Sequence, residues 1–118
     1  MARNSEAIIQ NAIVGWIRAC APQAICHSIP NGIHCSKSQG ALAVYTGLLK
    51  GALDLVVIDR CEPFYIEVKT DTGDLSKEQK EFMARLDTQG VRWIVAKSID
   101  DVRAAFDRWG IETREVAA

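Results

Sequence analysis

Several features that mark common classes of protein are missing from this sequence. Basic residues do not exceed acidic ones, because 14 Lys and Arg stand against 15 Asp and Glu. This balance excludes a polybasic protein that binds phosphates without specificity. Long apolar runs are missing too, and the longest clean run near the N-terminus spans only residues 12–17. A signal peptide or a membrane-spanning helix needs a longer run, so we expect an intracellular, cytoplasmic protein without a membrane partner.

The sequence also lacks the close metal-ligand pairs of a typical zinc site. Cys20, Cys26, His27, His34 and Cys35 lie near one another in the sequence, but they form no C-x2-C or H-x3-H pair. Buried thiols and loop histidines are therefore favoured over zinc ligands, and in an intracellular protein the cysteines are expected to be reduced. Cys26 and His27 are neighbours in a predicted strand, so their side chains diverge and do not form a nucleophile–base pair.

Repeats, low-complexity tracts and linkers are absent, and a length of 118 residues predicts one domain over residues 1–118 with an ordered core of about residues 4–110. Apolar periodicity predicts helices over residues 5–21, 76–90 and 98–109, a short helix around residues 41–49, and strands over residues 24–29, 53–59, 64–70 and 91–96. Gly47 and Gly51 are expected to loosen the end of the short helix, and the last eight residues to form a loose tail. This order predicts an α/β fold with a mixed central sheet flanked by helices, including a right-handed parallel crossover through residues 76–90.

The strongest chemical signal is the sequence Glu67-Val68-Lys69 in an alternating strand, where Glu67 and Lys69 share one face. An ion pair on a half-exposed sheet is the ordinary interpretation. Asp54 favours an active-site interpretation instead, because the hairpin of residues 53–59 and 64–70 brings Asp54 beside Glu67. Two carboxylates so close repel unless a cation or proton lies between them, and hard oxygen ligands suit Mg²⁺ or Mn²⁺. Lys69 could then orient an attacking water and stabilise charge on a phosphate.

The segments that carry this signal resemble a known family. They are residues 50–58 (KGALDLVVI), 66–69 (IEVK) and 73–80 (GDLSKEQK). In this order and spacing they resemble the virus-type replication-repair nuclease domain (VRR-NUC) of the PD-(D/E)xK nuclease superfamily. The resemblance covers nearly the whole chain and implies a restriction-endonuclease-like fold in a stand-alone nuclease domain, encoded by a bacterium or a phage. One departure is Leu53, which occupies the place of the family's usual proline but removes no ligand.

The same resemblance implies roles for individual residues. Asp54 and Glu67 would bind the metal together with the Val68 carbonyl, and Lys69 would be the catalytic lysine. Glu6 matches a glutamate of the first helix that approaches the metal, as a possible further ligand.

Two of the implied site residues could instead have local structural roles. Gln79 matches the glutamine of the helix after the E-x-K strand, but it also lies three residues after Ser76, where it would complete a capping box. An active-site role and a capping role can coexist for this side chain. Glu6 could merely favour the positive end of its helix.

The resemblance implies a divalent-metal-dependent endodeoxyribonuclease that uses Mg²⁺, with Mn²⁺ substituting, on branched DNA. Compact stand-alone members resemble Holliday-junction resolvases, and cutting two opposite strands predicts a twofold homodimer. A flap or nicking nuclease and a non-catalytic DNA-binding module of the same fold are the alternatives. Residues 1–53 contain four basic residues and a single acidic one, so this stretch could face phosphates. The candidate DNA-contacting residues are Arg3, Lys37, Lys50, Lys77 and Lys80.

Overall fold

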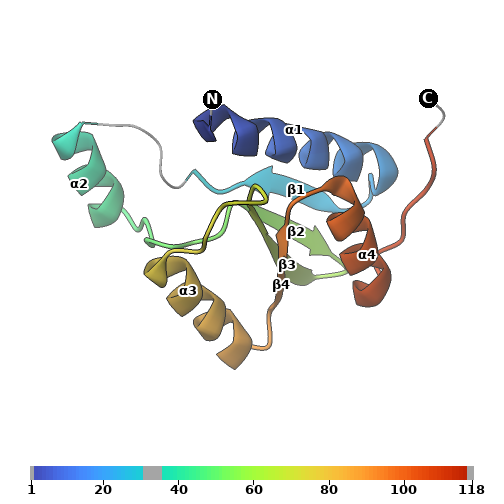
Figure 1. The fold of residues 1–118 in the computed structure, drawn as a ribbon. Helices are drawn as coiled ribbons and strands as arrows, with labels where there is room; N and C mark the ends of the chain where they lie inside the picture. The colour runs from blue at the N-terminus through green and yellow to red at the C-terminus, as the bar shows by residue number, and fades with distance from the viewer. Residues whose placement is uncertain (1, 31–35, 117–118) are drawn as a thin grey trace.

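The helices and strands follow one another along the chain in the predicted order (Figure 1). The computed structural model describes residues 2–30 and 36–116. The elements are α1 (Ala2–Cys20), β1 (Ile25–Ser28), α2 (Lys37–Tyr45), β2 (Leu55–Asp59), β3 (Glu62–Val68), α3 (Lys77–Thr88), β4 (Arg92–Ala96) and α4 (Ile99–Trp109). No helix in this described part of the chain is long and apolar enough to cross a membrane.

The strands form a mixed sheet in the order β1-β2-β3-β4. β2 pairs antiparallel with β1 and β3, whereas β3 and β4 are parallel and are connected through α3. The predicted hairpin and the parallel step are therefore confirmed. The hairpin turn is tighter than predicted, because Asp59 pairs with Glu62 and only Arg60 and Cys61 lie between them. Both turn residues have positive φ angles, 49° and 66°, a geometry that matches the twist of the flanking strands.

Helices cover the sheet on two faces. α1 and α4 pack on one face, where Ile13, Ile17, Val102 and Phe106 meet the buried side chains of the strands. α3 lies on the other face and packs its own apolar residues against β3 and β4. Because successive residues of a strand point to opposite faces, β3 directs Ile66 and Val68 towards α1 and α4. Glu67, between them, points to the α3 side, and this places the candidate site beside α3.

Two sequence predictions about the ends of elements were wrong. α2 begins at Lys37, earlier than predicted, because Ser36 and Gln39 form a capping box at its start. The C-terminal segment is held rather than loose up to Arg114, whose backbone N–H donates a 2.8 Å hydrogen bond to the Cys20 carbonyl at the end of α1. The last carbonyls of a helix have no partner within it, so α1 offers acceptors that bind the segment after α4.

Candidate active site

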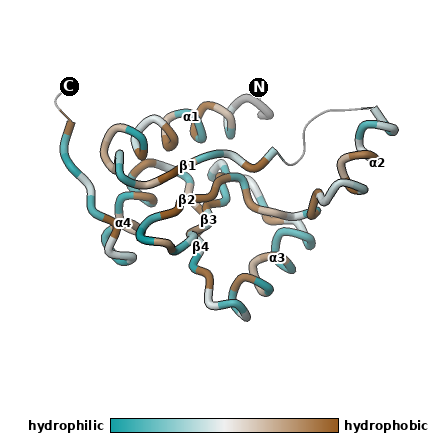
Figure 2. Tube along the Cα trace, turned by 180° about the vertical axis from the view of Figure 1, so that it is seen from behind, coloured by the Kyte–Doolittle hydropathy of each residue, from teal (hydrophilic) through white to brown (hydrophobic). Residues whose placement is uncertain are grey.

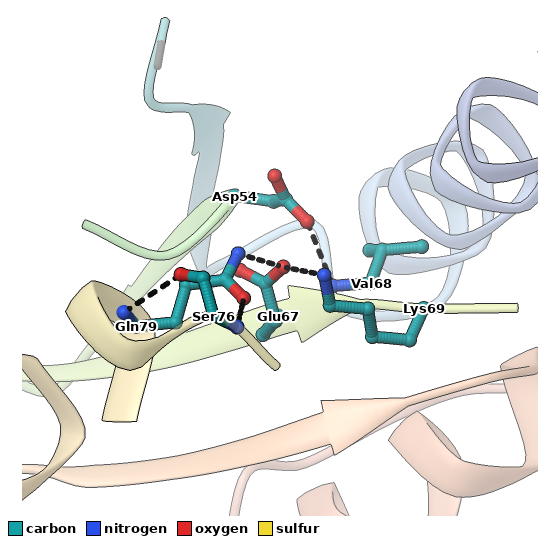
Figure 3. Close-up of polar contacts among 6 residues, drawn as sticks. All are labelled: Asp54, Glu67, Val68, Lys69, Ser76 and Gln79. Atoms are coloured by element: carbon teal, nitrogen blue, oxygen red, sulfur yellow. Dashed lines mark hydrogen bonds and ion pairs between the residues drawn. The ribbon is translucent and has the colours of Figure 1, made fainter. Parts of the chain in front are cut away.

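Asp54 lies just before β2, at the end of the hairpin where β3 finishes. The register pairs Leu55 with Ile66, so the next position along each strand brings Asp54 to Glu67. The backbone N–H of Val68 donates a 2.8 Å hydrogen bond to Oδ2 of Asp54 (Figure 3). The structure therefore brings Asp54 to the E-x-K segment, as the hairpin predicts.

Glu67 is almost completely buried, with 1% of its surface exposed, and its two oxygens have different surroundings. Oε2 accepts a 2.8 Å hydrogen bond from Nε2 of Gln79 and lies 3.5 Å from the Lys69 ammonium (Figure 3). Oε1 is buried without a hydrogen-bond partner among the residues that the structure describes. Burying a carboxylate oxygen without a partner is costly, so Oε1 calls for a cation or a proton.

Gln79 reaches Glu67 from the first turn of α3. Its side-chain Oε1 accepts a 2.9 Å hydrogen bond from the backbone N–H of Ser76, and its own backbone N–H donates to Ser76 Oγ over 3.1 Å. Because the side-chain oxygen of Gln79 accepts the hydrogen bond from Ser76, the NH₂ group of the same amide is directed towards Glu67. The capping box and the site contact are therefore made by the same side chain.

The close carboxylates shift each other's protonation. Burial, together with the charge of Asp54, raises the pKa of Glu67 from its ordinary value of 4.5 to about 7, although Lys69 opposes this shift. Burial also raises the pKa of Asp54, against the lowering effect of the Val68 N–H. A site that resists holding two negative charges gains from a bound cation, and carboxylate oxygens are ligands for Mg²⁺ or Mn²⁺. Asp54 and Glu67 are thus the residues that could hold a metal.

The raised pKa of Glu67 predicts how the stability of the metal-free protein depends on pH. In EDTA, the free energy of unfolding should fall as the pH rises from about 4.5 to 7, because the folded protein binds the Glu67 proton more tightly than the unfolded chain does. Glu67→Gln should remove most of this fall, and Glu81→Gln, an exposed control on α3, should retain it. Urea unfolding across this pH range measures the effect, and an identical pH dependence in Glu67→Gln would contradict it.

A substitution of Gln79 separates its two roles. Gln79→Glu retains a residue that suits a capping box, but it places a carboxylate where Glu67 now receives an N–H. We expect a lower thermal unfolding temperature in EDTA at pH 8, above the wild-type Glu67 pKa of about 7, because the added carboxylate repels the Glu67 carboxylate. Gln39→Glu is the matched control, because Gln39 occupies the same position in the capping box of α2. Equal shifts in the two variants would show that the contact with Glu67 is unimportant.

A pocket opens between the start of α3 and the segment that leads to β2. It is lined by Lys50, Gly51, Ala52, Asp54, Ser76, Glu78 and Gln79. Lys50 is exposed at this pocket and lies 3.7 Å from Glu78. Lys77 and Lys80 are exposed on the first turn of α3, and Lys37 is exposed at the start of α2. The side chain of Arg3, the remaining candidate for DNA contact, is outside the described residues.

Gly51 has a structural role that the sequence prediction missed. Its φ angle is +89°, and a Cβ atom at this position would lie 2.3 Å from the backbone oxygen of Glu78. The segment before Asp54 therefore packs directly on the backbone of α3. Gly51 allows this close approach, whereas from the sequence it was expected only to loosen the end of the short helix. The glycine between Lys50 and Ala52 was the sequence feature that could have indicated this contact, because glycine is favoured where two backbone segments approach closely.

The other residues considered as metal ligands are Glu6, the Cys and His residues between positions 20 and 35, and the Val68 carbonyl. Among residues 2–30 and 36–116, no three His, Cys, Asp or Glu side chains form a group that could hold a metal ion. The structure therefore does not gather Glu6 with Asp54 and Glu67, and Glu6 is half-buried on α1. Cys20, Cys26 and His27 form no such group by themselves, and His34 and Cys35 lie outside the described residues. The Val68 carbonyl stays a predicted ligand.

Comparison with known proteins identifies the family. The family model for the VRR-NUC domain matches residues 2–100, which include the whole candidate site. The chain belongs to the VRR-NUC domain family. Its fold is that of VRR-NUC structures, as a solved "VRR_NUC domain protein" superimposes with a TM-score of 0.72 at 22% identity, over 92% of this chain and 90% of the other.

A second solved VRR-NUC structure supports the same fold. This "VRR_NUC domain" has a TM-score of 0.65 at 19% identity, and the alignment covers 89% of this chain and 97% of that one. No curated protein matches the chain. Membership of VRR-NUC therefore means that the mixed sheet and its helices form a nuclease-type fold.

Proposed function

We propose that this VRR-NUC domain is a divalent-metal-dependent endonuclease that hydrolyses phosphodiester bonds in branched DNA, as a Holliday-junction resolvase does. The observation that carries the proposal is Oε1 of Glu67, a buried oxygen without a hydrogen-bond partner among the described residues, in a carboxylate next to Asp54. An ion pair of Glu67 with Lys69 alone would require neither the second carboxylate nor the unpaired oxygen. A cation bound between the two carboxylates would account for both features.

The proposed ligands of the cation are Asp54, Glu67 and the Val68 carbonyl, with Mg²⁺ as the cofactor and Mn²⁺ as a substitute. A bound divalent cation supplies Lewis-acid stabilisation of the negative charge that develops on the phosphate. Lys69 keeps its ammonium group 3.5 Å from Glu67, where it can hold an attacking water or a phosphate oxygen by a hydrogen bond. Gln79 fixes the orientation of Glu67 through Oε2.

Branched DNA is the proposed substrate, and a homodimer is the proposed active form. Lys50 lines the pocket beside Asp54, and Lys77 and Lys80 lie at the start of α3, so these side chains are proposed to contact the DNA backbone together with Arg3 and Lys37. Cleaving two opposite strands of a junction requires two sites, which a twofold dimer supplies.

Cleavage of defined DNA structures tests the function. A labelled four-way junction, a flap and a linear duplex of the same arm sequences should be incubated with the protein in Mg²⁺, Mn²⁺ or EDTA. We expect metal-dependent cleavage of the junction in preference to the duplex. Lys69→Ala should lower the rate by about 10²-fold or more, because it removes a preorganised positive charge, while Lys97→Ala, an exposed control after β4, should cleave normally.

The outcome of this assay separates the alternatives. Preferred cleavage of the flap, or single nicks in other substrates, would replace the junction by another DNA structure at the same catalytic site. Tight junction binding without cleavage in any divalent metal would indicate a non-catalytic DNA-binding module. Undiminished cleavage by Lys69→Ala would contradict the proposed active site.

A further inference from the structure

α2 stands apart from the rest of the molecule (Figure 1). None of its residues is buried, and it packs against none of the other helices and strands that the structure describes. Leu42, Val44 and Tyr45 are 61%, 63% and 88% exposed, and hydrophobic segments are visible along this outlying helix (Figure 2). A helix of nine residues is unstable alone in water, because helix stability in proteins comes mainly from tertiary packing. We therefore expect α2 to be stabilised by packing against another protein surface.

Part of the sheet surface is both apolar and exposed. On the face where α3 packs against β3 and β4, strand alternation also places Ile25 of β1 and Ile58 of β2. Ile25 pairs with Ile58, which pairs in turn with Pro63, so these three residues form a row across three strands. Ile25 is 59% exposed and Ile58 is 36% exposed. In α/β proteins such a surface is normally covered by another element, and we call these three residues the apolar row.

We propose that α2 of one copy of this chain packs on the apolar row of a second copy, and that the second copy does the same in return. The two contacts are equivalent, as a twofold symmetric dimer requires. A stable interface buries about 800 Å² on each partner, and α2, only about 14 Å long, is too short to supply this area alone. The reciprocal arrangement makes each copy contribute both a helix and a sheet surface.

The chemistry of the two surfaces favours protein over DNA. Lys37, at the first position, is the only charged residue of α2, and the apolar row has no charged residue. Binding to a DNA backbone needs Lys and Arg side chains on the contact surface. A second copy is favoured over an unrelated protein, because the described residues of one chain include both an exposed apolar helix that packs on no other element and an exposed apolar row on the sheet.

The proposed interface leaves the candidate active site open. Asp54 and Glu67 lie at one end of the β2–β3 hairpin, whereas Ile58 and Pro63 lie next to the turn at the other end. Residues 46–53 connect α2 to Asp54, so a partner bound to α2 is tied to the site through a short segment. The inference rests on the proposed function only in the use of two active sites. Its test measures mass and not cleavage, so failure of the dimer and failure of the nuclease are distinguishable.

The oligomeric state of the full chain tests the interface. Size-exclusion chromatography with light scattering, over a concentration series, should give twice the 13.0 kDa mass of one chain. The double variant Leu42→Glu/Tyr45→Glu and the single variant Ile25→Glu should each raise the dimer Kd at least about tenfold. All three side chains are exposed, so the circular dichroism spectra should be unchanged. Ile8→Glu, which alters an exposed apolar residue of α1 (69% exposed), should remain dimeric.

Mixing the variants tests the helix-to-row pairing itself. A mixed dimer of the α2 variant with Ile25→Glu retains one intact contact, between the unaltered α2 of one chain and the unaltered row of the other. We expect dimers to reappear in the mixture at concentrations where each variant alone is monomeric. A monomeric wild-type protein, as expected if α2 folds back on its own sheet, would overturn the proposal. A fully dimeric Ile25→Glu variant, as expected for pairing of α2 with α2, would also overturn it, and so would a mixture that stays monomeric.

Discussion

Asp54→Asn is expected to lower DNA cleavage by about 10³-fold or more, because catalysis by a bound cation depends on the charge of its ligands. Asparagine has nearly the same size, and its amide oxygen can still accept the hydrogen bond from the Val68 N–H. The variant therefore removes the negative charge while the hairpin end stays in place. Single-turnover cleavage of the best DNA substrate in Mg²⁺ measures the effect.

The same variant should gain stability in EDTA at pH 8. Asp54 and Glu67 raise each other's free energy when both are ionised and no cation lies between them, and Asp54→Asn removes this repulsion. Asp59→Asn is the matched control, because Asp59 is a buried carboxylate of the same β2 region that lies at the far end of the hairpin. It should cleave at the wild-type rate. Equal activity of Asp54→Asn and wild-type protein would exclude Asp54 from catalysis.

Gly51→Ala should destabilise the fold by about 3 kcal/mol or more. The left-handed backbone at φ +89° is strained for alanine, and the new Cβ would lie 2.3 Å from the carbonyl oxygen of Glu78. The obstacle is the backbone of α3, which has no rotamer to change, so α3 or the segment before Asp54 must move. Because small domains are stable by only about 5–15 kcal/mol, this loss is a large share of the total. Urea unfolding measures it.

Gly47→Ala is the matched control for this prediction. Gly47 also has a positive φ angle, +115°, but apart from its chain neighbours no atom of the described residues lies within 4 Å of the position that a Cβ atom would occupy. It should therefore show the backbone strain, about 1–2 kcal/mol, without the collision. Equal losses in the two variants would show that the contact between Gly51 and α3 contributes nothing to stability.

Much of the fold was predictable because it follows from local patterns. Strict alternation in β3 identified Glu67 and Lys69 as neighbours on one face, and the short connection between two strands predicted the hairpin that brings Asp54 to them. The second strand of the hairpin begins at Glu62, two residues earlier than predicted, because neither Arg60 nor Cys61 is a residue type typical of the positive φ angles of this tight turn. The segment around Arg114 was expected to be loose, since no local pattern reveals a hydrogen bond to the distant end of α1.

The arrangement of groups within the site depends on contacts between distant segments. Residue types and spacing were sufficient to place two carboxylates and a lysine together, because strand alternation and hairpin pairing are rules of local geometry. Packing of α3 on the sheet decided which oxygen of Glu67 accepts a hydrogen bond from Gln79 and which has no partner among the residues that the structure places. Packing also decided that Gly51 touches the α3 backbone and that α2 packs against none of the other elements that the structure describes. These outcomes depend on how elements far apart in the chain fit against one another, which no local pattern specifies.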